Sequence, residues 1–259
     1  MPQIPASQTP ARPGSSDPGP APIAPGALTQ FSLLAALMAG TYASGIRAAH
    51  ARELGDFGIG CVDRLGGEVV MLDGVVYECN AGGVATPMPD DELLPFADAC
   101  DLPHDLVARP VRGLGLHALT ETVEAALASR NLFHAVRVDG LFSSLRVRTT
   151  ARQALPLPTL EEVAEHQVET SLVGAEGTLV GFWSPALYQG VAVAGLHLHF
   201  LSADRSTGGH VLDATVADAD LRLAAYARFA LQLPTDAAFL ATELTHPDDA
   251  AVTEVEGGG

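Results

Sequence analysis

The stretch that decides the fold is Gly195-Leu196-His197-Leu198-His199-Phe200, in which two histidines alternate with apolar residues. In a β-strand alternate side chains lie on the same face, so His197 and His199 point the same way. Residues 202–209 are typical of a turn, and the apolar run that begins at His210 can return as the partner strand. This hairpin brings His210 beside His199. Three imidazoles on one face suit a Zn²⁺ ion that keeps an open position for water or substrate.

Histidines in such a pattern also occur in proteins of other kinds, and the residues alone do not decide between them. A single histidine in an apolar strand is more often a hydrogen-bonded core residue than a metal ligand. The His-x-His pattern also occurs in cupin barrels and in metal-dependent amidohydrolases. A cupin usually supplies a glutamate shortly after the pair, whereas residues 202–204 here are Ser, Ala and Asp. An amidohydrolase usually carries the pair near the start of its barrel, whereas here it lies late in the chain.

Composition excludes several classes of function. The 259 residues carry a formal net charge of −17, which argues against a nucleic-acid partner because phosphate binding needs clustered Lys and Arg. All 14 basic residues are arginine, and without a lysine amine the chain cannot form a Schiff base. The three cysteines, Cys61, Cys79 and Cys100, are widely spaced and predict buried free thiols.

The sequence predicts neither a membrane span nor export. No run reaches the roughly 20 apolar residues that cross a bilayer. Residues 31–40 resemble the apolar part of a signal peptide but lack a basic segment close in front. We therefore expect a cytoplasmic protein that does not bind membranes.

The order of patterns along the chain predicts an α+β fold with mostly antiparallel or mixed sheet, because there is no βαβ alternation. The Pro-rich residues 1–28 predict a disordered tail. We expect an N-terminal β-sheet subdomain over residues 29–150 and a metal-binding, β-barrel-like subdomain over residues 151–259. The expected helices are residues 28–46, 120–130 with Thr120 as N-cap, 160–165 and 221–231. The expected strands and hairpins are a hairpin turning at Asp73-Gly74, another over residues 133–148 turning at Asp139-Gly140, and strands at 178–183, 191–201 and 210–216.

Two other charged residues stand at strand ends where chemistry is possible. Glu68 follows a Gly-Gly turn, and Arg148 lies in Arg146-Val147-Arg148-Thr149. Either residue can equally be a solvated charge or half of an ion pair. The chain lacks the third glycine of a dinucleotide-binding motif after Gly58 and Gly60, and Ser184 lacks the glycines of a nucleophile elbow.

Several segments together resemble the α-acetolactate decarboxylase family, in the family's order and over roughly residues 29–256. The segments are 55–60 (GDFGIG), 65–74 (LGGEVVMLDG), 135–142 (AVRVDGLF), Arg148-Thr149, 177–185 (GTLVGFWSP), 195–200 (GLHLHF) and 204–213 (DRSTGGHVLD). The resemblance implies a zinc enzyme that converts (S)-2-acetolactate to (R)-acetoin and CO₂. It also implies a two-part subunit that forms a homodimer.

The resemblance also implies roles for particular residues. His197, His199 and His210 are the expected zinc ligands, and Glu68 and Arg148 the expected catalytic residues of the pocket. A further catalytic glutamate comes from a C-terminal tail that returns to the active site. Glu256 fits this place by spacing, with Glu254 as the alternative.

One position departs from the family pattern. The glycine-rich segment usually ends in Thr, where this chain has Cys61. We expect Cys61 to contact substrate, either as a close steric substitute for Thr or with an effect on preference, because a thiol is a poor hydrogen-bonding group.

These residues support a mechanistic hypothesis. Zinc held by three neutral imidazoles serves as the electron sink for an enediolate intermediate. Arg148 holds the carboxylate or the developing oxyanion, and Glu68 or the tail glutamate delivers the proton. The alternatives are a zinc-dependent decarboxylase or lyase of a related 2-hydroxy-3-keto acid, and a cupin-like metal-binding module without catalysis.

Overall fold

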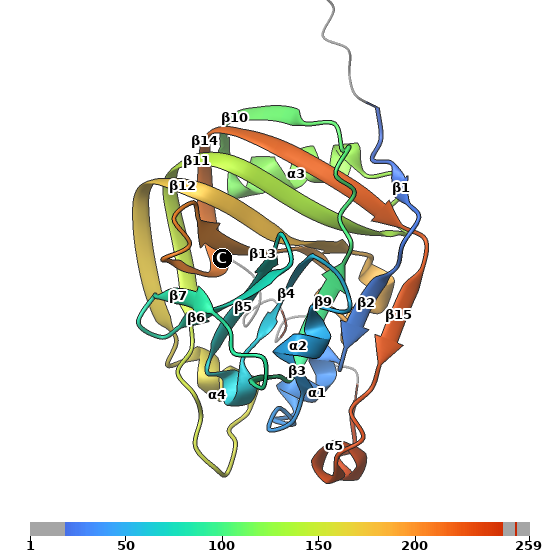
Figure 1. Cartoon of the computed structure of the whole chain (residues 1–259), viewed down its shortest axis with the longest axis vertical. Helices are drawn as coiled ribbons and strands as arrows, with labels where there is room; N and C mark the ends of the chain where they lie inside the picture. The colour runs from blue at the N-terminus through green and yellow to red at the C-terminus, as the bar shows by residue number, and fades with distance from the viewer. Residues whose placement is uncertain (1–18, 246–251, 253–259) are drawn as a thin grey trace, which may run out of the picture.

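The protein folds around two large β-sheets (Figure 1). The structure is a computed structural model, and it describes residues 19–245 and Val252. Within this part of the chain, one sheet has six strands, a second has seven and a third has two. Residues in strands far outnumber those in helices, as the sequence predicts.

The six-stranded sheet is built from long strands and carries all three histidines. The order is β1-β14-β11-β12-β13, and β10 also pairs with β14. Its strands are β1 (Ile23–Ala24), β10 (Arg109–Gly115), β11 (Phe133–Thr149), β12 (Val168–Ser184), β13 (Gly195–Ser202) and β14 (Gly208–Tyr226). All these pairings are antiparallel except that of β1 with β14.

The seven-stranded sheet carries Glu68. Its order is β15-β2-β9-β4-β5-β6-β7, and β15 pairs with β2 in parallel. Its strands are β2 (Leu28–Phe31), β4 (Phe57–Cys61), β5 (Gly67–Leu72), β6 (Val75–Asn80), β7 (Ala85–Pro87), β9 (Phe96–Cys100) and β15 (Phe229–Gln232). The small sheet pairs β3 (Ile46–Arg47) with β8 (Leu93–Leu94).

The helices are short except α3. They are α1 (Leu34–Met38), α2 (Ala48–Ala51), η1 (Asp63–Leu65), α3 (Leu116–Ala126), α4 (Leu160–Ala164), η2 (Ala186–Tyr188) and α5 (Ala237–Ala241). Helix α4 begins at a capping box, in which the Thr159 side chain accepts from the Glu162 backbone and the Glu162 side chain accepts from the Thr159 backbone. No helix within residues 19–245 is long and apolar enough to span a membrane.

The core lies in layers. Between the two large sheets, Phe57 and Ile59 of β4 pack with Ala135 of β11 and with Val180 and Phe182 of β12. On the other face of the six-stranded sheet, helix α3 lies against β10 and β14 (Figure 1), and its Leu119 and Val123 belong to an apolar cluster with residues of β11 and β14. The facing of the two sheets brings the histidines of one toward the glutamate of the other.

Part of the predicted secondary structure is confirmed. The Asp73-Gly74 turn joins β5 to β6, and both residues have positive φ, as a tight hairpin turn requires. The predicted strands at 178–183, 191–201 and 210–216 lie within or overlap β12, β13 and β14, and α4 matches the predicted helix at 160–165.

Three predicted elements are wrong. The predicted hairpin at 133–148 is one continuous strand, β11, and the predicted helix at 221–231 is the end of β14 followed by β15. The burial of Leu221, Leu223 and Ala225 with less buried residues at 220 and 222 has the period of a strand. The predicted helix at 28–46 shrinks to α1, because Leu28–Phe31 forms β2 and Ser32 turns the chain with φ 70°.

Two boundaries also shift at the N-terminal side. The predicted disordered tail does not extend to residue 28, because Ile23–Ala24 pairs with β14 and Ala21 is buried; residues 1–18 lie outside the described part. Helix α3 begins after Gly115, and Thr120 lies inside it, where its hydroxyl donates to the Leu116 carbonyl.

The expected barrel-like C-terminal part is not observed. Strands from both sides of residue 150 belong to each large sheet, since β14 pairs with β11 and β15 pairs with β2. The reason is the length of β14, which lies along β10 and β11 and leaves only its first residues to pair with β13. The division of the chain into two folding units at residue 150 stays a prediction.

Candidate metal centre and its pocket

The three predicted histidines meet on β13 and β14. His199 is paired directly with His210 across the two strands, and His197 lies one pleat along on the same face. One ligand atom from each ring lies within 4.8 Å of the others. The predicted convergence of His197, His199 and His210 is therefore confirmed.

A hydrogen bond to the opposite sheet orients the His199 ring. Its Nδ1 lies 2.8 Å from the carbonyl oxygen of Val69 on β5, so Nδ1 carries the proton and donates. In the neutral ring this leaves the Nε2 lone pair for a metal. A backbone carbonyl that orients a ligating imidazole in this way is a usual feature of metal sites.

The surroundings favour a neutral imidazole at His197, which is the form that binds metal. Burial first, and then the positive charge of Arg148, lower the pKa of His197 to about 3. His197 Nε2 lies 3.1 Å from His210 Nδ1. Two nitrogens on one tetrahedral Zn²⁺ stand about 3.3 Å apart, given Zn–N bonds of about 2.0–2.1 Å. The donor set therefore fits a single small metal ion, without specifying which one.

Glu68 and Arg148 reach the same place from different sheets. Glu68 lies on β5, and its Oε2 is 3.6 Å from His199 Nε2. Arg148 is paired with His210 across β11 and β14, and its Nη1 donates to Gln167 at 3.2 Å. Both charged residues are buried, Glu68 to 9% exposure and Arg148 to 6%. Buried charges of this kind are held by partners or mark sites of chemistry.

A pocket of about 590 Å³, including its open mouth, lies over these groups. Its polar lining comprises His197, His199, Glu68, Arg148 and Thr150, and Cys61 also lines it. The rest of the wall is mostly apolar and comes from α1, η1, β9, α4 and the loop before β13: Leu34, Leu37, Leu65, Phe96, Leu160, Val163, Ala164 and Val193. Few polar groups in an apolar pocket are typical of a small-molecule site.

Cys61 stands next to Glu68. The two residues are paired across β4 and β5, and the fully buried Cys79 is paired with Glu68 from the other side. Glu68 is thus flanked by two thiols on the face that looks toward the histidines. The pocket position expected for Cys61 agrees with this geometry, while its contact with substrate stays a prediction.

Sequence reasoning missed Thr150 and the turn that it supports. The Thr150 hydroxyl donates to the Leu65 carbonyl at 2.7 Å, and Arg64 and Leu65 both have φ 52°, in the left-handed region. This region is uncommon for residues other than glycine and marks a turn that its surroundings hold in place. Thr150 lies two residues after Arg148, and side chains two residues apart in an extended chain lie on the same face. This spacing is the sequence signal that could have identified Thr150 as a pocket residue.

The tail glutamates Glu254 and Glu256 lie outside the described residues. Val252 is described, and it is 2% exposed. It packs in the apolar cluster that includes Leu34, Leu37 and Val163 of the pocket wall. The chain two residues before Glu254 therefore lies against the pocket.

Comparison with known proteins agrees with this site. The family model for alpha-acetolactate decarboxylase matches residues 28–246. The alpha-acetolactate decarboxylase of Bacillus subtilis strain 168 is 34% identical over 233 residues, covering 88% of this chain and 90% of the relative. That of Methanosarcina mazei is 37% identical over 217 residues, covering 84% and 75%.

Solved structures show the same fold. A crystal structure of alpha-acetolactate decarboxylase from Bacillus subtilis strain 168 superposes with a TM-score of 0.86 at 32% identity, covering 89% of this chain and 99% of that one. A Staphylococcus aureus protein described as similar to alpha-acetolactate decarboxylase gives a TM-score of 0.83 at 29% identity, covering 88% and 98%.

The two-sheet fold, the three-histidine cluster and the buried charges beside it define an enzyme with a candidate metal centre. Its matches extend over most of the chain and over most of each relative. The chain belongs to the alpha-acetolactate decarboxylase family.

Proposed function

We propose that this protein decarboxylates (S)-2-acetolactate to (R)-acetoin and CO₂ with Zn²⁺ bound by His197, His199 and His210. The observation that carries the proposal is that Glu68 and Arg148 line one pocket with His197 and His199, while His210 completes the histidine group and is paired with Arg148. Zinc, when bound there, supplies an electron sink for the pair of electrons that CO₂ leaves behind. Membership of the family supports the choice of reaction.

The residues of the chain divide the remaining work. Arg148 is a permanently charged, planar donor and binds the carboxylate or the oxyanion that forms as charge moves. The carbon that loses CO₂ must then gain one proton, delivered to one face only. Glu68 is a carboxyl group in a largely apolar pocket and is placed to deliver that proton, or to share the task with Glu254 or Glu256. The apolar wall excludes water from this step.

The first test is acetoin release from racemic acetolactate by the purified protein, before chelation, after chelation and after zinc is restored. We expect release above the spontaneous rate that is lost on chelation and regained with zinc. Restoration with Mn²⁺ or Co²⁺ at equal occupancy identifies the metal that works best. A protein that holds zinc yet releases no acetoin contradicts the proposed substrate.

A decarboxylase or lyase of a related 2-hydroxy-3-keto acid is the alternative reaction, and Cys61 is the observation that favours it. Its thiol lines the pocket beside Glu68, where the family usually has Thr. Comparing kcat/KM for acetolactate and its ethyl homologue, in the wild type and in Cys61→Thr, separates the two substrates. The cupin-like module without catalysis is disfavoured, because Glu68 and Arg148 lie beside the histidines.

The homodimer and the cytoplasmic location are also part of the proposal. Both rest on the family resemblance. Light scattering on the purified protein and fractionation of cells that express it test them.

A further inference from the structure

Gln30 of β2 and Asp98 of β9 are buried polar residues, and Ser32 is buried just after the end of β2. Gln30 and Asp98 are direct partners across β2 and β9, so their side chains lie side by side on one face. Gln30 and Ser32 are 0% exposed and Asp98 is 5% exposed. On its other side Asp98 is paired with Ile59 of β4, whose side chain belongs to the core between the sheets.

The hydrogen bonds of Gln30 leave one requirement unmet. Its Nε2 donates to the carbonyls of Ser32 and Val191, both at 2.7 Å, so both amide protons are used. Its Oε1 can only accept, and within residues 19–245 and Val252 it has no hydrogen-bond donor. Asp98 Oδ1 beside it is in the same situation. Each unsatisfied buried acceptor costs about 1–3 kcal/mol, so two neighbouring ones are not expected in a stable fold.

One proton satisfies both groups. We propose that Asp98 is a neutral carboxylic acid in the folded protein and donates its O–H to Oε1 of Gln30. No other protonation state turns this pair of acceptors into a donor and an acceptor. Burial alone raises the pKa of Asp98 to about 8, in agreement with this assignment.

The groups that face Asp98 do not oppose the assignment. Its strand neighbours Gln30 and Ile59 are uncharged, and the core residues across the gap, Val180 and Phe182 among them, are apolar. The titratable groups on its face are thiols, phenols and the carboxyl group of Glu68, which lies two strands away on β5 and whose negative charge also favours a neutral Asp98. Burial raises the pKa of Cys100 and of Tyr226, which keeps both neutral. Cys61 lies farther along the same face, paired with Phe96.

The Asp98–Gln30 pair is connected to the pocket wall through the hydrogen bonds of Gln30. Val191 O, which accepts from Gln30, also accepts from Leu34 N at 3.0 Å in the first turn of α1, and Gly190 O accepts from Ala35 N at 2.9 Å. Leu34 of α1 and Val193 of the same loop line the pocket. Asp98 is therefore a positioning residue, which acts through Gln30 on the segment that holds α1.

The test is the urea midpoint of the wild type and of Asp98→Asn from pH 5 to pH 9, with the exposed Asp101→Asn as the matched control. The folded pKa lies above the ordinary 3.8, so the stabilisation is complete below pH 3.8, declines as pH rises and is lost above about pH 8. Asn keeps the shape and an N–H donor but does not titrate. We therefore expect the wild-type and Asp101→Asn midpoints to fall with pH relative to Asp98→Asn, which has the highest midpoint at pH 8.

An Asp98→Asn midpoint below that of the wild type at every pH, with the pH dependence unchanged, overturns the proposal. If this variant does not fold, ¹³C NMR of wild-type protein labelled at aspartate carboxyls decides. One resonance that stays at the protonated position at pH 6 supports the neutral acid, and titration of all resonances with ordinary pKa values overturns it. Neither measurement uses substrate, so neither depends on the proposed function.

The positioning role has its own readout, which rests on the proposed function. Asp98→Ala leaves Gln30 Oε1 without a donor, so we expect KM to rise several-fold with a smaller change in kcat, and Asp98→Asn to restore KM. Equal loss of folded protein and kcat in both variants, with KM unchanged, indicates a merely structural residue.

Discussion

At the residue scale, hydrogen bonds decide what each histidine does. In His134, Nε2 accepts from the Ala128 backbone N–H at 3.0 Å, and Nδ1 donates to the Leu132 carbonyl at 3.0 Å. Both ring nitrogens of His134 are therefore hydrogen-bonded to backbone. Burial lowers the pKa of His134 to about 4 and keeps it neutral. In His199 the Nδ1 donates to the Val69 carbonyl, and Nε2 lies 3.6 Å from Glu68 Oε2. His134 is therefore a structural residue. His199 instead has a ligand atom within 4.8 Å of those of His197 and His210.

Glu68→Gln separates metal binding from proton delivery. We expect the variant to keep its metal, because the three imidazoles are unchanged, and to lose roughly 10²–10⁴-fold in turnover, as for removal of a general acid. His197→Ala is the comparison and should lose metal and activity together. Metal content by mass spectrometry and acetoin release on the same samples measure both. Full activity in Glu68→Gln rejects its role as proton donor.

Thr150→Val tests the left-handed turn beside the pocket. The variant removes the hydroxyl that donates to Leu65, which costs about 1 kcal/mol of hydrogen-bond energy, or roughly fivefold in an equilibrium. We expect kcat/KM for acetolactate to fall several-fold because Leu65 lines the pocket. Thr150→Ser keeps the hydroxyl and should restore kcat/KM. Equal loss in both variants means that volume, not the hydrogen bond, matters.

The site could be predicted from sequence only where spacing or family resemblance defined it. The i, i+2 histidines and the turn before His210 fix their convergence, because the period of a strand leaves no freedom. Glu68 and Arg148 needed the resemblance, since nothing in their own segments brings two sheets together. Thr150 and the Asp98–Gln30 pair depend on contacts between distant strands, which no local pattern encodes.

At the scale of elements, β11 shows how a glycine can mislead. Asp139-Gly140 has the composition of a hairpin turn, yet both residues lie in the middle of a 17-residue strand. A Cβ on Gly140 would lie 2.4 Å from Asp218 O and 2.5 Å from Ala219 Cα of β14. The glycine is there because two backbones approach closely, and not because the chain reverses. By contrast Asp73-Gly74 is a turn, with nothing within 4 Å of a Cβ on Gly74.

Gly140→Ala should therefore destabilise the fold. The new Cβ meets backbone atoms, which cannot move without breaking the β11–β14 ladder, and overpacking of this kind costs about 1–3 kcal/mol or more. Gly26→Ala is the control, since a Cβ there meets nothing within 4 Å. Urea unfolding followed by far-UV circular dichroism measures both. A Gly140→Ala variant as stable as Gly26→Ala contradicts this account of the strand.

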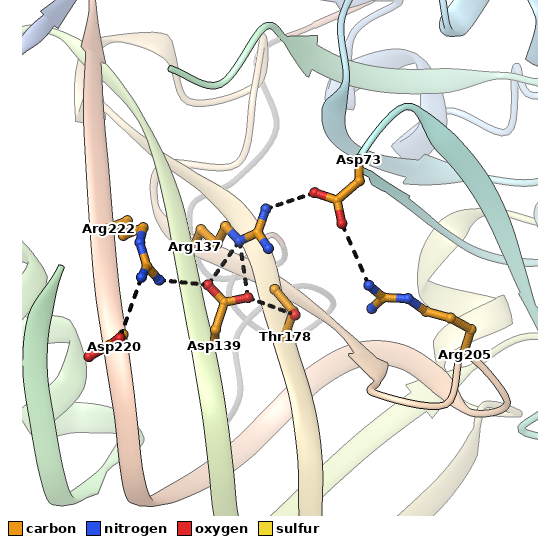
Figure 2. Close-up of polar contacts among 7 residues, drawn as sticks. All are labelled: Asp73, Arg137, Asp139, Thr178, Arg205, Asp220 and Arg222. Carbon is orange, nitrogen blue, oxygen red and sulfur yellow. Dashed lines mark hydrogen bonds and ion pairs between the residues drawn. The ribbon is translucent and has the colours of Figure 1, made fainter. Parts of the chain in front are cut away.

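At the scale of the whole molecule, a charge network joins the two large sheets, as Figure 2 shows. Asp139 of β11 accepts from Arg137 Nε at 2.9 and 3.0 Å, from Arg222 Nη1 at 2.9 Å and from the Thr178 hydroxyl at 3.0 Å. Arg137 also donates to Asp73 at 3.0 Å, in the β5–β6 turn of the other sheet. Arg205 lies 3.6 Å from the same Asp73.

Two aspartates of this network, Asp139 and Asp73, should contribute unequally to the free energy of unfolding. Asp139→Ala leaves Arg137, Arg222 and Thr178 without their shared acceptor, and we expect a loss of roughly 2–4 kcal/mol in the free energy of unfolding. Asp73 is 59% exposed, against 29% for Asp139, so Asp73→Ala should cost less than about 1 kcal/mol and lose its effect in high salt. Urea unfolding at low and at high salt measures both variants. Equal costs show that the network is screened throughout.

The parallel pairing of β15 with β2 has a consequence for folding during protein synthesis. Leu28 of β2 is the partner of Phe229 of β15. The edge of the sheet that carries Glu68 is therefore completed only by a strand that is synthesised long after β2. Until β15 emerges from the ribosome, β2 presents an uncovered row of amides and carbonyls, the kind of edge that recruits other chains. Production of this enzyme should therefore depend on translation speed and on chaperone supply during synthesis, more than the stability of the finished protein suggests.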